Sequence, residues 1–363
     1  MSVEFIGFIN TRQASEIHPP QGPVIDVAYV GQVARAHEEA GFDRALIAFH
    51  ADSPESLLVA AHAASVTERL GFMVAHRPGF TAPTLAARQF ATLDQFSGGR
   101  AAVHIITGGD DAELKQDGDY LTKDQRYART SEYLDVVRKT WTQTEPFDHH
   151  GRYYHFEGVR SAVRTVSGRG LPVYFGGASD AAIDVAGRHA DTYALWGETH
   201  AQVREITARV NASAARHGRT PRYSLSLRPI LADTEEKAWA RADAILERAR
   251  DLAPRSGFVR SAAGPANAGS QRLLAAAAQG VRLDKRLWTG MAALTGAKGN
   301  STALVGTPEQ VADALLDYHD LGIGTFLIRG FDPLEDATDY GRSLIPLTRA
   351  LIARKRPAIA AAA

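Results

Sequence analysis

Polar and aromatic side chains follow the short apolar segments of this sequence with unusual regularity. They are Asn10, Thr11, Arg12, His50, His76, Arg77, His104, Thr107, Ser179, Trp196, Glu198, Arg228, Arg329 and Phe331. Arginine makes fork-like hydrogen bonds to sulfonate, phosphate or carboxylate oxygens, and aromatic side chains accommodate planar ligands. The set predicts a site for a planar, partly apolar cofactor together with an anionic group. An open alternative is that about half of these arginines and histidines only bond backbone carbonyls or carboxylates of the fold.

A glycine pair provides a second candidate. The stretch YFGGASDAA at Tyr174–Ala182 places two glycines and a serine between an apolar segment and a helical pattern. Backbone N–H groups at a helix N-terminus with little side-chain bulk in front can bind a phosphate. The hydroxyl of Tyr127 is a candidate for the same phosphate. Glycine pairs also serve purely as turns, and Tyr127 fits equally well as a packed core tyrosine.

Several other chemistries lack their residues. The sequence has no GxGxxG after its first strand, no GxxxxGK[ST] and no GxSxG, which disfavours a dinucleotide-binding unit, a P-loop and a serine hydrolase. It has no cysteine, so disulfides, thiolate metal sites and a cysteine nucleophile are excluded. Asp148-His149-His150 and Gly109-Asp110-Asp111 lack ligands at a recognisable metal spacing, so we expect no metal.

The elements that must position these side chains alternate between strand and helix patterns. Eight strands are predicted: Val3–Ile9, Phe42–Phe49, Leu70–His76, Ala101–Thr107, Pro172–Gly177, Asp191–Trp196, Tyr223–Leu231 and Gly324–Arg329. The predicted helices are Ala28–Ala40, Glu55–Glu68, Ala82–Phe96, Asp124–Trp141, Ser179–His189, Gln202–Ala214, Glu235–Leu252 and Leu334–Ile352. This alternation predicts one α/β domain over residues 1–363, a (β/α)8 barrel whose strands carry the active site at their carboxyl ends.

Two segments interrupt the alternation. Residues 145–158, EPFDHHGRYYHFEG, predict an inserted hairpin, and residues 254–298 predict extra helices with a mobile lid over the site.

Charge and terminal sequence limit the partners and the compartment. Lysine and arginine number 41, as do aspartate and glutamate, so no overall field favours nucleic acid or an anionic membrane surface. The N-terminal MSVEFIGFINTRQ does not resemble a secretory signal, and no stretch of roughly 20 apolar residues predicts a membrane span. We therefore expect a cytoplasmic protein.

Long segments of the chain resemble the luciferase-like flavin monooxygenases, in particular their two-component alkanesulfonate monooxygenase branch. The resemblance is carried by HRPGFTAPTLAARQFATLDQFSGGRAAVHIITGGDDAELKQDGDYL from His76, DQRYARTSEYLDVVRKTW from Asp124, VYFGGASDAA from Val173 and ALWGE from Ala194. It continues through LWTGMAALTG, TALVGTPEQVADAL and LGIGTFLIRGFDPLED, and so covers nearly the whole chain.

The resemblance implies a bacterial-luciferase-like barrel that forms a homodimer or homotetramer. It implies reduced FMN, supplied by a separate NAD(P)H:flavin reductase, and O2 as co-substrate, with an organosulfonate cleaved to an aldehyde and sulfite. By position, the FMN phosphate falls near Tyr127, Gly177, Ala178 and Ser179, and the isoalloxazine near Asn10, His104 and Thr107. Arg228 would hold the sulfonate and Trp196 would line the substrate pocket, so Arg228, Asn10 and Trp196 are the predicted catalytic residues.

The chain departs from that branch on the substrate side. Ser53 stands where the branch has cysteine, Ile230 and Asn10 where it has histidine, and Phe331 where it has tyrosine; Thr295 or Lys298 replaces a lid arginine. Further donors, namely Arg12, His50, His76 and Lys298, are predicted to face the substrate. A hydroxylated or sugar-derived sulfonate is therefore one hypothesis. Others are a sulfone, a chlorinated aromatic or a heterocycle as substrate, a non-catalytic flavin-binding protein, and a deazaflavin in place of FMN.

Overall fold

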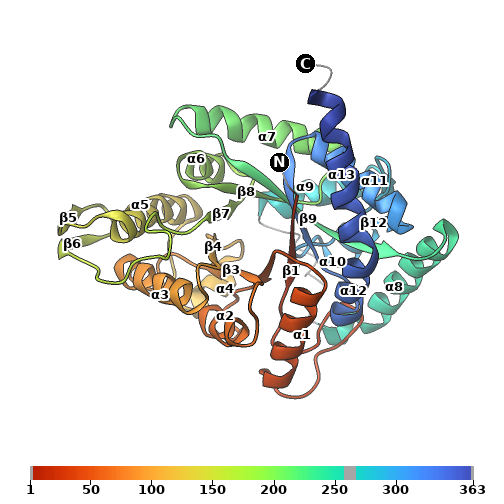
Figure 1. Ribbon diagram of the computed structural model, residues 1–363, viewed down its shortest axis with the longest axis horizontal. Helices are drawn as coiled ribbons and strands as arrows, with labels where there is room; N and C mark the ends of the chain where they lie inside the picture. Colours follow the sequence, from red (N-terminus) through yellow and green to blue (C-terminus); the bar gives the residue numbers. More distant parts are fainter. Residues whose placement is uncertain (1–2, 257–266, 361–363) are drawn as a thin grey trace. The chain divides into compact units, whose positions relative to one another are not determined.

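The computed structural model describes residues 3–256 and 267–360 of the chain (Figure 1). The chain divides into two compact units. Unit 1 comprises Met1–Ala45, Ala194–Thr207 and Arg222–Ala363, and unit 2 comprises Leu46–Tyr193 and Ala208–Pro221. That the units form a single domain stays a prediction.

All eight predicted barrel strands are present. They are β1 (Glu4–Phe8), β2 (Arg44–Ile47), β3 (Gly71–His76), β4 (Ala101–Ile105), β7 (Val173–Gly176), β8 (Thr192–Trp196), β9 (Arg222–Leu231) and β13 (Ile323–Ile328). In unit 1, β1 pairs in parallel with β13 and β13 with β9. In unit 2, β3 pairs in parallel with β4 and β4 with β7. The strand order β1-β2-β3-β4-β7-β8-β9-β13 returns to β1, which confirms the predicted eight-stranded barrel class.

The predicted helices are also present, with ends shifted by a few residues. They are α1 (Val27–Glu39), α2 (Ser56–Ser65), α3 (Pro83–Phe96), α5 (Lys123–Thr142), α6 (Asp180–His189), α7 (His200–Ala215) and α8 (Glu235–Ser256). The last predicted helix is divided into α12 (Pro333–Asp339), a π-helical turn (Tyr340–Leu344) and α13 (Ile345–Ala360). Side-chain caps fix several starts: Asp26 accepts from the Tyr29 amide, and Thr122 forms a capping box with Gln125.

Five elements of the structure were not predicted from the sequence. They are the short α4 (Asp111–Gln116), the strand β12 (Ala303–Gly306), the helix α11 (Pro308–Asp320) and a two-stranded arm, β10 (Arg282–Leu283) with β11 (Leu287–Trp288). The arm pairs with β12, which pairs in parallel with β9. Helix α11 begins with a capping box of Thr307 and Gln310, a signal that the sequence displays.

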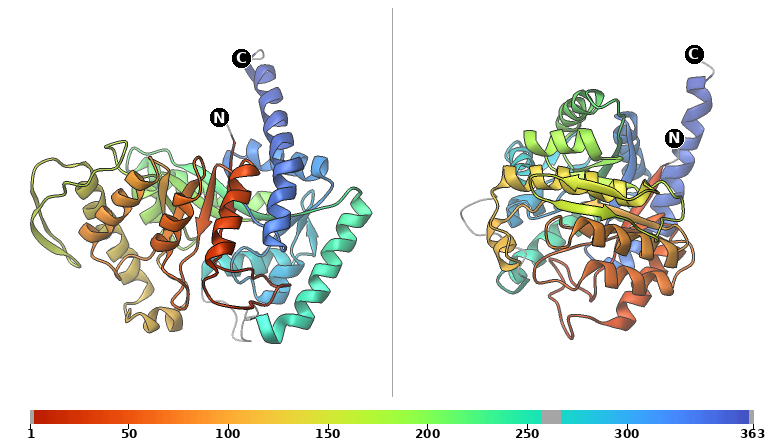
Figure 2. Two further views of the ribbon diagram at one scale, coloured as in Figure 1. Left: turned by 60° about the horizontal axis from the view of Figure 1, so that its bottom comes forward. Right: turned by 90° about the vertical axis from the view of Figure 1, so that its left-hand side faces the viewer.

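The two predicted insertions have different outcomes. Strands β5 (Phe147–His150) and β6 (His155–Val159) form the predicted antiparallel hairpin, which in Figure 2 lies beside α5 within unit 2. The carboxylate of Glu132 on α5 accepts the backbone N–H groups of Tyr153 and Tyr154 and so holds the hairpin. In the second insertion, α9 (Ala268–Ala277) and α10 (Gly290–Thr295) confirm the extra helices. Residues 257–266 of the predicted lid lie outside the described residues.

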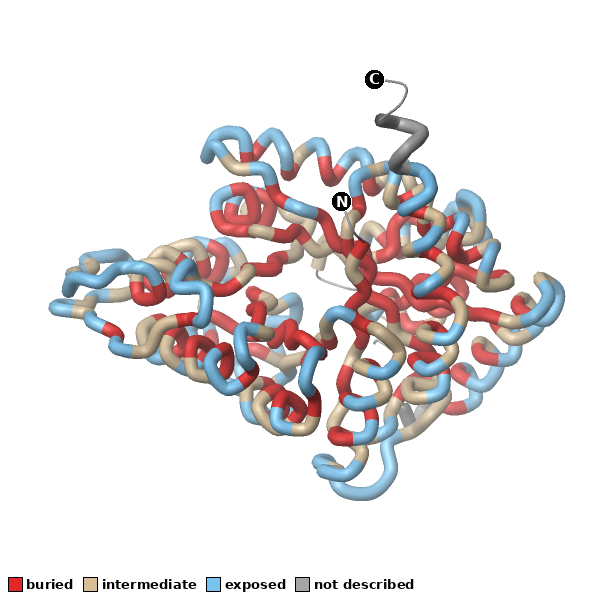
Figure 3. Tube along the Cα trace, viewed as in Figure 1, coloured by how far each residue is buried: buried red, intermediate tan, exposed pale blue. Residues whose placement is uncertain are grey.

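Buried side chains concentrate on the strands, while the helices are exposed on one side (Figure 3). Every residue of β3 is buried, as expected for a strand covered on both faces. In unit 1, Ile230 of β9, Trp288 of β11 and Met291 of α10 share one hydrophobic cluster with Ala238 and Ala242 of α8. The cluster fixes the unpredicted arm against α8. Within the described part of the chain, no helix has both the length and the apolar character of a membrane span.

Candidate functional site

The turn between β7 and α6 has the features of a phosphate-binding site. Gly177 has φ +137°, and a Cβ there would lie 2.8 Å from Cβ of Ala182 and 3.1 Å from the Tyr127 hydroxyl. Ser179 caps α6 by accepting from the Ala182 amide, and the Tyr193 hydroxyl donates to the Gly177 carbonyl oxygen over 2.6 Å. Glycine at position 177 therefore avoids a clash with Ala182 and Tyr127, and a helix N-terminus without side-chain bulk in front of it is an arrangement that can bind an anion.

Tyr127 lies at the same turn, as the sequence predicts. It is buried, and its ring contacts Phe175 of β7 with the centroids 6.4 Å apart. Burial raises the pKa of its phenol, although a hydrogen bond with Ser179 opposes the rise. Tyr127 is therefore a neutral hydrogen-bond donor at neutral pH. All four residues that the sequence predicts to bind the phosphate lie in unit 2: Tyr127, Gly177, Ala178 and Ser179.

Two buried polar atoms on β4 and just after it lack partners. Among the described residues, neither Nδ1 of His104 nor Oγ1 of Thr107 has a hydrogen-bond partner. Burial lowers the pKa of His104 to about 4, so the imidazole is neutral at pH 7 and can donate or accept according to its tautomer. Buried polar groups are normally satisfied. The edge of an isoalloxazine, which carries both donors and acceptors, suits this pair, so the residues present fit the predicted flavin.

In unit 1, Arg228 is fully buried and already has a counter-ion. Its Nη1 donates to Oε1 of Glu16 over 2.7 Å, its Nη2 donates to the Gly330 carbonyl oxygen over 3.0 Å, and its Cζ lies 3.4 Å from the Phe331 ring centroid. Burial would raise the pKa of Glu16, but Arg228 and Arg329 together hold it below its ordinary value. Glu16 is therefore ionised. Sequence reasoning missed this carboxylate, which follows β1 by only eight residues.

Arg329 is a second guanidinium beside the same carboxylate. Its Nη2 lies 3.7 Å from Oε1 of Glu16, and its Cζ lies 5.0 Å from the Phe8 ring centroid. Burial and the neighbouring Arg228 lower the pKa of Arg329 to about 10, which leaves it protonated at pH 7. Its Nε has no partner among the described residues, and 22% of the side chain is exposed. The three groups carry a net charge of one positive unit.

Arg228 and Arg329 line a cavity in unit 1. The other lining residues are Phe8, Asn10, Ala14, Ser15, His37, Ile328, Gly330, Pro333, Ala337 and Tyr340. The structure thus brings the predicted Asn10 and Arg228 together, and Asn10 bonds the Ala14 carbonyl oxygen through its amide nitrogen over 3.2 Å. Phe331, also predicted, forms the stacking face of Arg228 rather than part of the cavity wall.

Three predicted residues of unit 1 lie elsewhere. Trp196 is half-buried at the end of β8 and packs on a small cluster formed by Leu273 of α9 with Ala292 and Ala297. Arg12 donates to the Gly22 carbonyl oxygen over 3.2 Å, and Lys298 is exposed after α10. None of the three lines the cavity with Arg228.

His76 of unit 2 was predicted to face the substrate, but the structure places its ring elsewhere. Its Nε2 lies 2.6 Å from the Tyr133 hydroxyl, and its ring packs edge-on against Phe90, so it occupies an apolar cavity against α3 and α5. Burial lowers its pKa to about 4. A ring on the helix side of β3 does not face a substrate at the strand ends. We therefore leave His76 out of the proposed substrate contacts.

The predicted residues after β2 are solvent-accessible. The His50 side chain is 59% exposed, and its Nδ1 lies 3.5 Å from Oε1 of Glu113. Ser53 is exposed, and its backbone amide donates to the His50 carbonyl oxygen over 3.1 Å. Glu113, on the unpredicted α4, is the residue that organises this loop.

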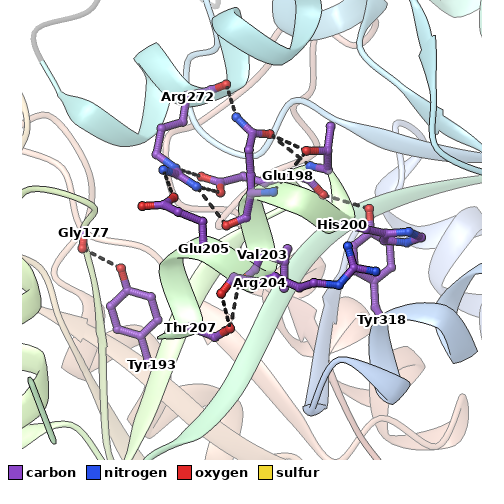
Figure 4. Close-up of polar contacts among 12 residues, drawn as sticks. Gly177, Tyr193, Glu198, His200, Val203, Arg204, Glu205, Thr207, Arg272 and Tyr318 are labelled. Carbon is purple, nitrogen blue, oxygen red and sulfur yellow. Dashed lines mark hydrogen bonds and ion pairs between the residues drawn. The ribbon is translucent and has the colours of Figure 1, made fainter. Parts of the chain in front are cut away.

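Glu198, at the end of β8, anchors α9 instead of facing a ligand (Figure 4). Arg272 of α9 donates from Nε and Nη2 to the two Glu198 carboxylate oxygens over 2.8 and 2.7 Å. Its Nη1 donates to Glu205 of α7 over 2.5 Å, and Gln202 donates in return to the Arg272 carbonyl oxygen. This bidentate pairing fixes α9 to the start of α7 within unit 1.

Comparisons with known proteins agree with these observations. Residues 3–325 match the family described as Luciferase-like monooxygenase. A riboflavin lyase crystallised with modified FMN and riboflavin is similar in structure, with a TM-score of 0.79 and 20% identity over 96% of this chain and 92% of that one. EDTA monooxygenase from Chelativorans sp. BNC1 gives a TM-score of 0.76 and 20% identity over 96% and 94%. DmoA from Hyphomicrobium sulfonivorans gives 0.74 and 20% identity over 96% and 88%.

At these identities the solved structures establish the fold alone, whereas the family match spans most of the chain. The barrel topology and the glycine turn before α6 agree with that match. The chain belongs to the luciferase-like monooxygenase family.

Proposed function

We propose that this protein is a monooxygenase that uses reduced FMN and O2 to oxidise a small anionic organosulfur compound, with an organosulfonate as the first candidate. The observation that carries the proposal is the glycine turn at the start of α6, where a Cβ on Gly177 would meet Ala182 and the Tyr127 hydroxyl, so that only backbone lies between the helix N-terminus and Tyr127. A separate NAD(P)H:flavin reductase would supply the reduced flavin, since no dinucleotide-binding motif occurs in the sequence. A homodimer or homotetramer is part of the same proposal.

On the cofactor side, residues of unit 2 would bind the FMN and orient its ring. The backbone at residues 177–179 and the helix N-terminus receive the phosphate, and Tyr127 donates to it as a neutral phenol. His104 and Thr107 bond the ring edge. Bound reduced FMN supplies, with O2, the oxygen atom that is transferred.

On the substrate side, the cluster of Glu16, Arg228 and Arg329 selects a substrate with a negative charge. Because Glu16 neutralises one guanidinium, the cluster binds a single anionic group, and Arg329 has the accessible N–H donors. Arg228 stabilises Glu16 and thereby orients Arg329. For a sulfonate, the C–S bond and one C–H bond of the same carbon break, a C=O bond forms, and sulfite leaves with the electron pair of the C–S bond. O2 would supply the carbonyl oxygen and the oxygen of one water, with two electrons and two protons taken from reduced FMN, and one proton is released from the carbon.

A second candidate keeps the cofactor and changes the substrate to an uncharged sulfone or heterocycle, whereas a sulfosugar carries a sulfonate and belongs with the first candidate. The pairing of Arg228 with Glu16 favours it, because a compensated arginine attracts an anion less strongly than a free one. A flavin-binding protein without catalysis is the remaining alternative, and it would give no product from any substrate.

The test is sulfite release from alkyl, hydroxyalkyl and sugar-derived sulfonates with FMN, NAD(P)H and a generic flavin reductase. A sulfone of matched chain length serves as the neutral substrate. We expect sulfite from at least one sulfonate, and we expect Arg329→Gln to raise KM for it about tenfold or more while leaving KM for the sulfone within about twofold. Oxidation of the sulfone alone would transfer the assignment to the second candidate.

A further inference from the structure

The carboxyl end of β3 carries a buried arginine, Arg77, which has no part in the proposed phosphate or substrate contacts. In the pairing of β3 with β4, Ala75 is opposite His104 and His76 is opposite Ile105. His76 and Ile105 both line the apolar cavity against α3 and α5, so Ala75 and His104 face the other side of the sheet. Continuing the alternation by two residues places Arg77 on the face of His104.

The guanidinium of Arg77 is held on one side only. Its Nη2 donates to Oε1 of Glu113 over 2.7 Å, and its Cζ lies 5.2 Å from the Phe49 ring centroid and 6.0 Å from that of Phe80. The Arg77 side chain is 4% exposed. Its Nε and Nη1 have no hydrogen-bond partner among the described residues. Buried N–H groups of a charged side chain are expensive to leave unpaired, so these donors point to a ligand with acceptor atoms.

The charge around Arg77 narrows the class of ligand. Glu113 is ionised: burial works against its charged form, but hydrogen bonds from His50 and Arg77 lower its pKa to about 2. The Arg77–Glu113 pair is therefore neutral as a whole and is a poor site for a full sulfonate charge. It suits a partial or delocalised negative charge. Unpaired polar atoms of Thr107 and His104 lie at the end of the adjacent strand in the same unit.

We propose that Arg77 is a flavin-binding residue that donates through its unpaired N–H groups to acceptor atoms of the pyrimidine ring and stabilises the anionic form of reduced FMN. The proposal rests on the proposed FMN cofactor. Such a contact would distinguish the two redox states of the flavin. The reduced anion carries negative charge at N1 and the C2 carbonyl oxygen, whereas the oxidised ring carries none there. Glu113, Phe49 and Phe80 are positioning residues that fix the orientation of the guanidinium plane.

The test is anaerobic titration of the full chain with FMN and with reduced FMN, for wild type, Arg77→Lys and Arg77→Met. Lysine keeps the positive charge but lacks the planar guanidinium group with its several N–H donors. Arg100→Met is the matched control: Arg100 also stacks on a phenylalanine, with its Cζ 5.4 Å from the Phe72 ring centroid, but it precedes β4 and bonds the Leu70 and Ser97 carbonyl oxygens. Thermal unfolding without flavin verifies that each variant folds.

We expect both Arg77 variants to weaken binding of reduced FMN at least about tenfold more than binding of oxidised FMN. The pH titration of the bound reduced flavin should also shift toward the neutral form. Arg100→Met should leave the ratio of the two dissociation constants unchanged. Equal weakening of both forms, or no change, overturns the inference while the FMN assignment stands. A wild-type chain that binds neither form of FMN overturns the proposed function and the inference with it.

Discussion

Position 177 requires glycine for two separate reasons, its φ of +137° and the 2.8 Å that would separate a Cβ from Ala182. Gly177→Ala should therefore destabilise the fold by about 1–3 kcal/mol and weaken FMN binding about tenfold or more. Gly218→Ala is the control, because Gly218 has φ +64° with no atom near its would-be Cβ. Fluorescence titration with FMN should separate the two variants; equal affinities would argue against the turn as the phosphate site.

Glu16 is the residue on which the cluster of unit 1 depends. Glu16→Gln leaves the fully buried Arg228 without a counter-charge, so the free energy of unfolding should fall by about 3–5 kcal/mol. Urea denaturation at pH 7 measures this. Asp184→Asn, which removes the partner of Arg216 in a pair whose side chains are 66% and 63% exposed, should cost less than about 1 kcal/mol. Similar losses for both variants would contradict the importance assigned to Glu16.

The sequence could place the residues proposed for the phosphate at one turn because all of them but Tyr127 are contiguous. It could not predict that Arg228 is compensated, since Glu16 is 212 positions away and only the fold pairs them. The same reason applies to Arg77 and Glu113, which are 36 positions apart. His76 was misplaced because alternation along β3, and not its position at the strand end, decides which way its ring points.

At the scale of elements, the βα alternation was predictable from apolar periodicity, and so were extra helices in the insertion after α8, whereas the short strands of that insertion were not. Strands of two residues such as β10 and β11 carry no periodic signal. Helix α11 was predictable in principle from its Thr307-Pro308 start and capping box, but no helix was predicted between the insertion, which ends at residue 298, and the last strand.

The contacts of Arg272 lead to a prediction about the stability of α9 alone. Arg272→Gln removes the bidentate bonds to Glu198 and the bond to Glu205, so amide hydrogen exchange in Ala268–Ala277 should accelerate about tenfold or more. Exchange in β9 and β13 should not change, because Arg272 bonds neither strand. Arg209→Gln, which removes an exposed pair with Asp180, is the control. Unchanged exchange in α9 would show that its hydrophobic cluster is sufficient to hold it.

At the scale of the whole molecule, buried histidines predict a pH dependence of stability. Burial lowers the pKa of His37, His76 and His104 to about 4, and burial with neighbouring arginines lowers that of His189 to about 3. The unfolded chain, with ordinary pKa values near 6.5, then binds more protons between about pH 4 and 6.5. The free energy of unfolding should fall on acidification through this window, by up to about 1.4 kcal/mol per pH unit for each histidine.

Urea denaturation at half-unit intervals from pH 4.5 to 7.5 checks this dependence. His189→Gln should reduce the slope, because it removes one of the buried histidines whose pKa is lowered. A stability that is flat between pH 5 and 7 would contradict the burial of neutral histidines.

The proposed function depends on reduced FMN being the cofactor of this barrel. The most direct measurement is anaerobic equilibrium titration of the wild-type chain with reduced FMN, oxidised FMN and the reduced deazaflavin F420. We predict that reduced FMN binds with one site per chain and more tightly than either of the others. Tighter binding of the deazaflavin, or binding of none of the three, would contradict the account.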